Sequence, residues 1–354
     1  MNIKASFSKK ILQFKFDAGT SRGVMKTRPV WYIQLYSSKH KEYSGIGEAA
    51  PLEGLSVETS SLMDEKLNEV CQLIDKGVIQ EILDICKIDT IESYPSIKFA
   101  LEMAFLDLNN NYIKVIFNNN FSRGIKGIPI NGLVWMGTEE FMLKQISEKI
   151  NEGYNCIKLK IGALNFEVEL RILNYIRSQF TKDEISIRLD ANGAFNTDEA
   201  LIKLEKLAEY QIHSIEQPLK QGQVKAMRQL CASSPIPIAL DEELIQVQTI
   251  EDKINLIEYI QPQFIILKPT LLGGFANCEE WVKIGEERSI GWWATSALES
   301  NIGLNAISQW MANFDVDIPQ GLGTGQLFHN NIESPLTIQQ GYLYYDIDKS
   351  WGTI

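Results

Sequence analysis

Residues 185–190 read Ile-Ser-Ile-Arg-Leu-Asp, a short apolar run that ends in a carboxylate. The arrangement recurs downstream, where Glu216 follows His-Ser-Ile, Asp241 follows Ile-Pro-Ile-Ala-Leu, and Lys268 follows Phe-Ile-Ile-Leu. The four charged residues stand about 26 residues apart, roughly the length of one strand and one returning helix in a parallel α/β fold. This part of the sequence therefore predicts parallel strands that each end in a charged side chain.

The region from 126 to 325 alternates throughout between short β-rich runs and longer amphipathic stretches. Eight such runs favour a closed parallel barrel. An open doubly wound sheet is the alternative, but it more often carries a G-x-G-x-x-G turn after an early strand, and this sequence has none. The predicted strands are Pro129–Val134, Cys156–Ile161, Ile185–Asp190, His213–Glu216, Pro237–Asp241, Phe264–Lys268, Ile290–Ala294 and Val316–Pro319.

Residues 1–125 are predicted to form a separate α+β capping domain. A strand-rich start gives way to a helical segment from about Val57 to Cys86, and Pro95 begins a helix that we expect to connect to the barrel. Residues 326–354 contain a short β-like run and are expected to return to the capping domain. The strand signals at the start lie at Ile11–Phe16, Val30–Tyr36 and Glu48.

Composition limits the classes of partner. The chain has 354 residues, 45% of them hydrophobic, and a formal net charge of −11, which argues against binding to nucleic acid or to an anionic membrane surface. No apolar run reaches the roughly 18 residues of a membrane span. We therefore expect a cytoplasmic enzyme with a small-molecule substrate. An oligomer is compatible with the sequence but does not follow from it.

The carboxylates predict a metal site. Residues at the C-terminal ends of barrel strands face the same cavity, so Asp190, Glu216 and Asp241 are expected to converge. Buried like charges are unfavourable unless a cation neutralises them. Carboxylate oxygens, with no histidine or thiolate nearby, favour Mg²⁺, with Mn²⁺ as a substitute.

Lysines complete the predicted chemistry. The alternation in Cys156–Ile161 places Lys158 and Lys160 on one strand face, and Lys160 is expected to face Lys268 across the substrate. Neighbouring cations and desolvation lower a lysine pKa, which suits Lys160 to act as a base. Lys158 is expected to keep Lys160 deprotonated and to contact a metal-bound carboxylate. The pattern predicts an enzyme that removes a proton beside a carboxylate.

Three loops suggest how the rest of the substrate is held. The Gly321-Leu-Gly-Thr-Gly325 turn and Thr295-Ser296 both fit a second carboxylate, although a glycine-rich turn also simply closes a barrel. Residues 19–28 contain Arg22, Lys26 and Arg28. This loop is interpreted either as a mobile basic lid over an anionic substrate or as an ordinary solvated loop.

The ordered motifs Lys158-Leu-Lys160, Asp190-Ala-Asn-Gly193, Glu216-Gln-Pro218, Asp241-Glu-Glu243 and Lys268-Pro269 resemble the muconate-lactonising branch of the enolase superfamily. Within that branch, the segments 295–303 and 321–325 are most similar to those of the o-succinylbenzoate synthase family. The resemblance implies a (β/α)7β TIM-like barrel with an N-terminal α+β capping domain.

The resemblance also implies roles. Asp190, Glu216 and Asp241 bind Mg²⁺. Lys160 abstracts the α-proton of 2-succinyl-6-hydroxy-2,4-cyclohexadiene-1-carboxylate, an intermediate of menaquinone biosynthesis, and then assists loss of hydroxide. Lys268 stabilises the enediolate or serves as the alternate acid or base. The residues expected to contact this dicarboxylate are Ser296, Gly321, Leu322, Gly323, Arg22 and Asn192.

Other readings of the same residues stay open. Lysines on opposite faces equally suit a racemase of N-acylamino acids or a dipeptide epimerase. No acidic pair stands at Thr295-Ser296-Ala297 to hold a dipeptide ammonium, and this favours the dehydratase. A metal-independent Schiff-base aldolase would use Lys268 as a nucleophile. A barrel that had become a non-catalytic binding protein would be expected to lack one of these residues, and none is missing.

Overall fold

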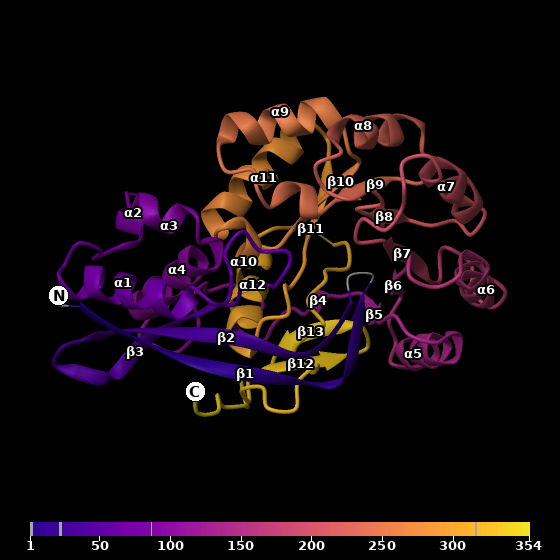
Figure 1. Cartoon of the computed structure of the whole chain (residues 1–354). Coiled ribbons are helices and arrows are strands. Elements are labelled where there is room, and N and C mark those ends of the chain that lie inside the picture. Colours follow the sequence, from indigo (N-terminus) through magenta and orange to yellow (C-terminus); the bar gives the residue numbers. More distant parts are fainter. Residues whose placement is uncertain (1–2, 21–22, 86, 316) are drawn as a thin grey trace.

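The computed structural model describes residues 3–20, 23–85, 87–315 and 317–354. Figure 1 shows an N-terminal unit of long strands and helices beside a curled parallel sheet, whose helices lie on its outer side. No helix in the described ranges is both long and apolar enough to span a membrane. The architecture is the predicted one, a TIM-like barrel with an N-terminal α+β unit.

The N-terminal unit is a three-stranded antiparallel sheet in the order β1-β2-β3. All three predicted strand signals fall within these strands. The predicted helical segment from Val57 is broken into shorter helices, and Cys86 lies outside the described residues. The elements are β1 (Ile3–Thr20), β2 (Gly23–Ser37), β3 (His40–Ala49), α1 (Met63–Asp75), α2 (Ile82–Ile85), α3 (Asp89–Glu92) and α4 (Pro95–Asn109).

Helix α4 lies directly against strand β3 because two glycines allow the backbones to touch. A Cβ atom on Gly45 would lie 2.2 Å from the carbonyl oxygen of Ala104, and one on Gly47 would lie 1.8 Å from that of Ala100. Real Cβ contacts are not this short, so a side chain at either position would push the helix away. These glycines therefore set how closely the helix covers the sheet.

The barrel sheet has seven parallel strands in the order β11-β10-β9-β8-β7-β6-β5. Its register places Lys160 beside Asp190 and Asp190 beside Glu216, so the charged residues lie at one level. The strands are β5 (Gly132–Val134), β6 (Cys156–Lys160), β7 (Ser186–Asp190), β8 (Ser214–Glu216), β9 (Ile238–Leu240), β10 (Phe264–Leu267) and β11 (Gly291–Ala294). The helices and the 3-10 turn are α5 (Glu139–Asn151), α6 (Phe166–Arg177), α7 (Ala200–Ala208), α8 (Val224–Ser233), η1 (Glu242–Leu244), α9 (Ile250–Ile260), α10 (Pro269–Leu272), α11 (Phe275–Glu287) and α12 (Asn301–Met311).

The predicted eighth strand is the main difference from the sequence-based expectation. Within the described residues near 316–319 there is no strand, and Val316 itself lies outside them. The chain closes the barrel instead through single parallel bridges from Gln320 to Ile130 and from Gly321 to Thr295. The side chain of Gln320 accepts the Ala294 N–H at 2.7 Å, so a side chain takes over part of a ladder that a longer strand would supply.

The first predicted barrel strand is also divided. Its beginning is β4 (Ile128–Pro129), which pairs with the C-terminal hairpin of β12 (Leu336–Gln339) and β13 (Tyr342–Tyr345), and its end is β5. After residue 325 the chain also meets the N-terminal sheet, because Phe328 forms an antiparallel bridge with Phe14. The C-terminal segment thus touches both units.

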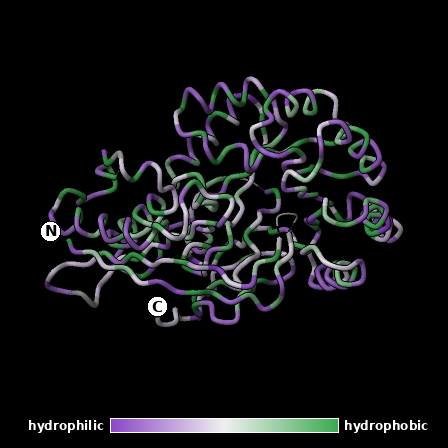
Figure 2. Tube along the Cα trace, in the orientation of Figure 1, coloured by the Kyte–Doolittle hydropathy of each residue, from purple (hydrophilic) through white to green (hydrophobic). Residues whose placement is uncertain are grey.

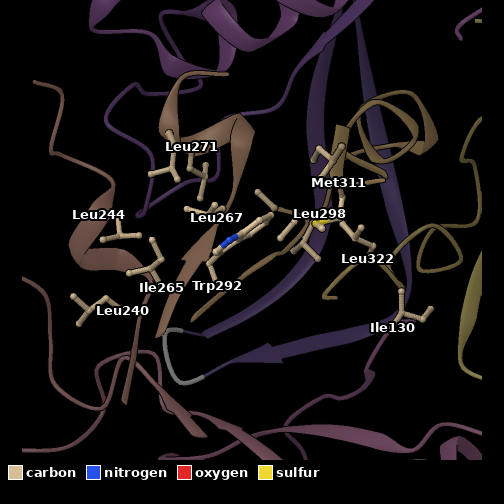
Figure 3. Packing of buried hydrophobic residues seen from close by; sticks show 14 of the residues in the cluster. Ile130, Leu240, Leu244, Ile265, Leu267, Leu271, Trp292, Leu298, Met311 and Leu322 are labelled. Carbon is tan, nitrogen blue, oxygen red and sulfur yellow. The ribbon is translucent and has the colours of Figure 1, made fainter. Parts of the chain in front are cut away.

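The main hydrophobic cluster runs from the N-terminal strands to the closing segment, and Ala239, Ile266 and Trp293 form a small separate cluster. In Figure 3, Leu240, Ile265 and Leu267 from neighbouring strands lie close to one another, and Leu298, Leu322 and Ile130 gather near the closing segment. Figure 2 shows that the outer helices carry both hydrophilic and hydrophobic segments, as expected for helices with one face on a sheet. This rigid base holds the charged strand ends in place.

Glu102 joins the two units through a buried carboxylate. Its side chain, on α4, accepts the backbone N–H of Phe275 at the start of α11. Burial raises the pKa of Glu102 to about 7 from an ordinary value of 4.5, although this hydrogen bond acts in the opposite direction. Its favourable contribution to folding is therefore complete below pH 4.5 and is lost as the pH rises through 7.

We expect the free energy of unfolding of the Glu102→Gln variant to fall less between pH 5 and pH 8 than that of the unmodified chain, by about 2 kcal/mol. Urea unfolding at the two pH values measures this difference. Glu92→Gln, which changes an exposed carboxylate on α3, serves as the control and should follow the unmodified chain. Equal losses for Glu102→Gln and the unmodified chain would contradict the assignment.

Candidate active site

A cavity of about 690 Å³, its open mouth included, lies at the C-terminal ends of the barrel strands. The N-terminal unit contributes Met25, Leu52 and Leu55 to its lining, so the substrate space is enclosed by both units. The residues predicted from the sequence that line it are Lys158, Lys160, Asp190, Asn192, Lys268, Ser296, Gly321 and Gly323.

Three carboxylates stand on neighbouring strands at one side of this cavity. Asp190 ends β7, Glu216 ends β8, and Asp241 directly follows β9, and each is at most 2% exposed. Burial and the negative charge of Asp190 raise the pKa of Glu216 well above its ordinary value. No donor among the described residues lies within hydrogen-bond distance of Glu216 Oε1, and Lys268 Nζ is 3.8 Å from it.

Each carboxylate is paired with a lysine from the same strand ends. Lys158 Nζ contacts Glu216 Oε2 and lies 3.0 Å from Asp190 Oδ2, Lys160 Nζ lies 2.8 Å from the same Asp190 oxygen, and Lys268 Nζ contacts Asp241 Oδ2. Burial disfavours the charged lysines, but the carboxylates outweigh it and raise the pKa of Lys158 and of Lys268. The lowering of the pKa expected of the facing lysines, Lys160 and Lys268, is therefore wrong for Lys268.

The residues fit a divalent cation in their chemistry. In the described residues, no group of three or more acidic, histidine or cysteine side chains is already arranged to bind a metal ion. The three acids nevertheless lie on consecutive strands, and Glu216 Oε1 is buried without a donor. Hard oxygen ligands of this kind suit Mg²⁺.

Asn192 holds the position of Lys160. Its Oδ1 accepts a hydrogen bond from Lys160 Nζ at 2.8 Å, while its Nδ2 donates to Glu242 Oε1 at 3.1 Å. The backbone of Asn192 has a φ of 45°, in the left-handed region, and its N–H donates to Asp190 Oδ1. Asn192 therefore lines the cavity and orients the lysine beside it, and its contact with the substrate stays a prediction.

Gln217 was not predicted from the sequence. It is fully buried directly after Glu216, and its Oε1 accepts the backbone N–H of Asp241 at 3.2 Å. Its Nε2 donates to Glu243 Oε2 and to the Leu219 carbonyl. Gln217 thus fixes the end of one carboxylate strand against the next. The signal available was a polar residue at a strand end within the Glu-Gln-Pro motif.

The wall opposite the carboxylates is built from hydroxyl groups and backbone. Thr324 Oγ1 donates to Ser296 Oγ at 2.8 Å, and Ser296 Oγ in turn donates to Glu299 Oε2 at 2.5 Å. Glu299 is fully buried and also accepts from Thr270 and from the Ala297 N–H. The hydroxyl of Ser296 therefore already has an acceptor inside the protein.

Arg28 ties the N-terminal sheet to this wall. Its guanidinium is buried and donates to the carbonyl oxygens of Ala50, Pro51, Ala297 and Leu298. Arg28 therefore belongs neither to a mobile basic lid nor to an ordinary solvated loop, the two alternatives given above, because the backbone of distant loops surrounds its side chain. Lys26 is exposed and lies 3.8 Å from Asp17, and Arg22 lies outside the described residues.

The glycine-rich turn after the last bridge approaches the cavity with its backbone. Gly321, Gly323 and Thr324 line the cavity. Leu322 was predicted to contact the substrate, but its side chain packs in the core, which leaves only its backbone for such a contact. Among the described residues, none accepts a hydrogen bond from the N–H groups of Leu322, Gly323 or Thr324. Successive unpaired N–H groups of this kind form an anion-binding surface.

Asn131 is a second residue that sequence reasoning missed. It precedes β5, is 4% exposed, and lines the cavity between Lys158 on the next strand and the glycine-rich turn. Its Oδ1 makes no hydrogen bond with the described residues. The available signal was a single carboxamide within the apolar run 128–135.

Comparison with known proteins agrees with this geometry. The family model described as Enolase C-terminal domain-like matches residues 142–346, more than half of the chain. An o-succinylbenzoate synthase from Desulfotalea psychrophila is 42% identical, over 96% of this chain and 98% of its own length. A hydrophobic dipeptide epimerase from a Flavobacteria bacterium is 26% identical over 68% of each chain.

Solved structures show the same fold. A crystal structure of MenC from Desulfotalea psychrophila has a TM-score of 0.86 and 38% identity, covering 97% of this chain and all of its own. A dipeptide epimerase from Enterococcus faecalis, complexed with Mg and a dipeptide, has a TM-score of 0.84 at 20% identity, covering 99% and 98%. The chain therefore belongs to the Enolase C-terminal domain-like family, in the muconate-lactonising branch of the enolase superfamily.

Proposed function

We propose that this chain is an o-succinylbenzoate synthase, a lyase that dehydrates 2-succinyl-6-hydroxy-2,4-cyclohexadiene-1-carboxylate in menaquinone biosynthesis. The 42% identity to an o-succinylbenzoate synthase over nearly the full length supports this activity. The observation that carries it is the group of three lysines and three carboxylates at the strand ends, of which the lysines and Asp190 line the cavity, while the rest of the cavity lining is uncharged. A substrate with two carboxylates matches these two parts of the cavity lining.

In this proposal Asp190, Glu216 and Asp241 hold Mg²⁺. The bound ion would act as a Lewis acid on the substrate carboxylate and lower the free energy of the dianion formed when the α-proton leaves. Substitution by Mn²⁺ stays a prediction.

The three lysines have different roles, which follow from their positions in the site. Lys160, at the end of β6, takes the α-proton on its Nζ atom, which breaks the C–H bond and leaves its electrons in the enediolate. The same ammonium then gives that proton to the departing hydroxide, so the C–O bond breaks and water forms. Lys268, on the other side of the carboxylates, stabilises the enediolate charge, and Lys158 holds the carboxylates beneath the substrate.

The wall composition separates this reaction from dipeptide epimerisation. A dipeptide carries an ammonium group, which needs an anionic partner in the site. Of the described residues that line the cavity, Asp190 alone is acidic, and it stands on the lysine side. Glu299 lies behind Ser296 and is fully buried. The far wall thus offers hydrogen-bond donors and no counter-ion for an ammonium.

The proposed division of the chain follows the same reasoning. Residues 1–125 cap the site, residues 126–325 form the catalytic barrel, and residues 326–354 return to the cap. The Phe14–Phe328 bridge and the contributions of Met25, Leu52 and Leu55 to the cavity support this arrangement. The substrate is a small dicarboxylate.

The test is conversion of 2-succinyl-6-hydroxy-2,4-cyclohexadiene-1-carboxylate to o-succinylbenzoate, followed by absorbance. We expect rapid conversion with Mg²⁺, loss of activity in excess EDTA, and recovery when Mg²⁺ is restored. Absence of conversion with Mg²⁺ present would reject the proposed function.

A further inference from the structure

We infer that Asn131 binds the second carboxylate of the substrate, the one remote from the three acids, and so sets the preference of the site for dicarboxylates. The inference rests on the proposed function and adds a residue to it. A buried carboxamide normally has hydrogen-bond partners for both of its ends. Asn131 is 96% buried and faces the cavity, yet its Oδ1 has no partner in the described part of the chain.

The backbone holds Asn131 at the required place. Its N–H donates to the Gln320 carbonyl at 3.0 Å, which fixes it beside the segment that closes the barrel. A Cβ atom on Gly323 would lie 3.6 Å from the Asn131 carbonyl oxygen, so the glycine-rich turn passes directly alongside. The Asn131 side chain and the unpaired N–H groups of Gly323 and Thr324 therefore border the same end of the cavity.

The hydroxyl groups nearby are already engaged. Thr324 donates to Ser296, and Ser296 donates to Glu299, so either would have to break a buried hydrogen bond to bind a carboxylate. Asn131 has no such bond to break. Its Oδ1 is the inaccessible end of the carboxamide, so the NH₂ group, which makes no hydrogen bond with the described residues either, is the end that can donate to a ligand in the cavity.

The side chains that border this end of the cavity are mostly uncharged. Of the lysines among the described lining residues, Lys158 stands on β6, the strand next to β5, and Lys268 follows β10, which pairs with β11. A negative charge placed at position 131 would still repel the carboxylate of the ligand directly. Asn131→Asp should therefore weaken binding of a carboxylate more than truncation to alanine does.

The experiment compares two ligands of the Mg²⁺-loaded chain by calorimetry. One is o-succinylbenzoate, and the other is 2-propionylbenzoate, which lacks only the terminal carboxylate. For Asn131→Ala we expect the Kd for o-succinylbenzoate to rise by about 10- to 100-fold, since a hydrogen bond to a charged group is lost, and for Asn131→Asp by more. The Kd for 2-propionylbenzoate should stay within about twofold in Asn131→Ala.

Turnover gives an independent readout, because kcat/KM of Asn131→Ala should fall mainly through KM. Asn277→Ala, which truncates a buried asparagine bonded to Leu272 outside the cavity, is the matched control and should bind both ligands normally. Unchanged binding of both ligands by Asn131→Ala, or equal loss of both, would overturn the inference. Failure of the unmodified chain to bind o-succinylbenzoate would instead refute the proposed function.

Discussion

Replacing Lys160 by alanine is expected to slow dehydration by at least about 10³-fold, while the variant still folds and still binds o-succinylbenzoate. Positioned general bases commonly contribute about 10² to 10⁴ in rate, and Lys160 has two proton transfers to perform. Its Nζ lies 2.8 Å from both Asp190 Oδ2 and Asn192 Oδ1, so its position is fixed. Single-turnover kinetics measure the chemical step, and calorimetry measures ligand binding.

A matched control is available in Lys253. This lysine is 1% exposed and donates to Glu280 at 2.6 Å, on the outer side of the barrel. Lys253→Ala should lower the free energy of unfolding but leave the rate of dehydration per folded molecule unchanged. A Lys160→Ala enzyme that stays within about tenfold of the normal rate would show that another group removes the proton.

Replacing Glu216 by glutamine is expected to weaken Mg²⁺ binding by at least about 100-fold and to remove detectable dehydration. Glu216 is the central member of the three carboxylates, and its buried Oε1 is free of hydrogen-bond donors among the described residues. The substitution keeps the shape of the side chain and removes one ligand charge. Calorimetric titration with Mg²⁺ measures the affinity.

Thermal unfolding separates this loss from misfolding. In EDTA, Glu216→Gln should still unfold cooperatively but at a lower melting temperature than the unmodified chain, because Lys158 loses one of its two buried carboxylate partners. The rise in melting temperature on adding Mg²⁺ should disappear. Glu102→Gln, which changes a buried carboxylate outside the cavity lining, should keep that rise. Normal Mg²⁺ affinity in Glu216→Gln would contradict the proposed ligand set.

The structure also bears on the Schiff-base alternative. An aldolase of that kind needs a neutral lysine amine as its nucleophile. Lys268 is instead ion-paired with Asp241, and, although burial opposes its charge, the neighbouring carboxylates raise its pKa. A charged ammonium suits stabilisation of an enediolate and does not suit attack on a carbonyl group.

The strands and the charged cluster could be predicted because their signals are local. Alternation within a strand and even spacing between strands place Lys160, Asp190 and Glu216 on one face and at one level without knowledge of distant contacts. The eighth strand could not be predicted in the same way, because Gln320 replaces ladder hydrogen bonds with its side chain.

The residues that sequence reasoning missed, and those to which it gave the wrong role, depend on contacts between distant segments. Arg28 reads as a loop cation until the carbonyl groups at 297 and 298 surround it. Ser296 reads as a substrate donor, yet its hydroxyl is held by Glu299. A lone asparagine such as Asn131 is ambiguous in sequence, because only the folded barrel shows that its carboxamide lacks a partner.

The most direct test of the central claim is a comparison of kcat/KM for three reactions of the same Mg²⁺-loaded protein. These are dehydration of 2-succinyl-6-hydroxy-2,4-cyclohexadiene-1-carboxylate, racemisation of an N-succinylamino acid, and epimerisation of a dipeptide. The proposed function predicts that dehydration exceeds both others by at least about 10³-fold, equivalent to roughly 4 kcal/mol of transition-state stabilisation. Racemisation or epimerisation that equals or exceeds dehydration would contradict it.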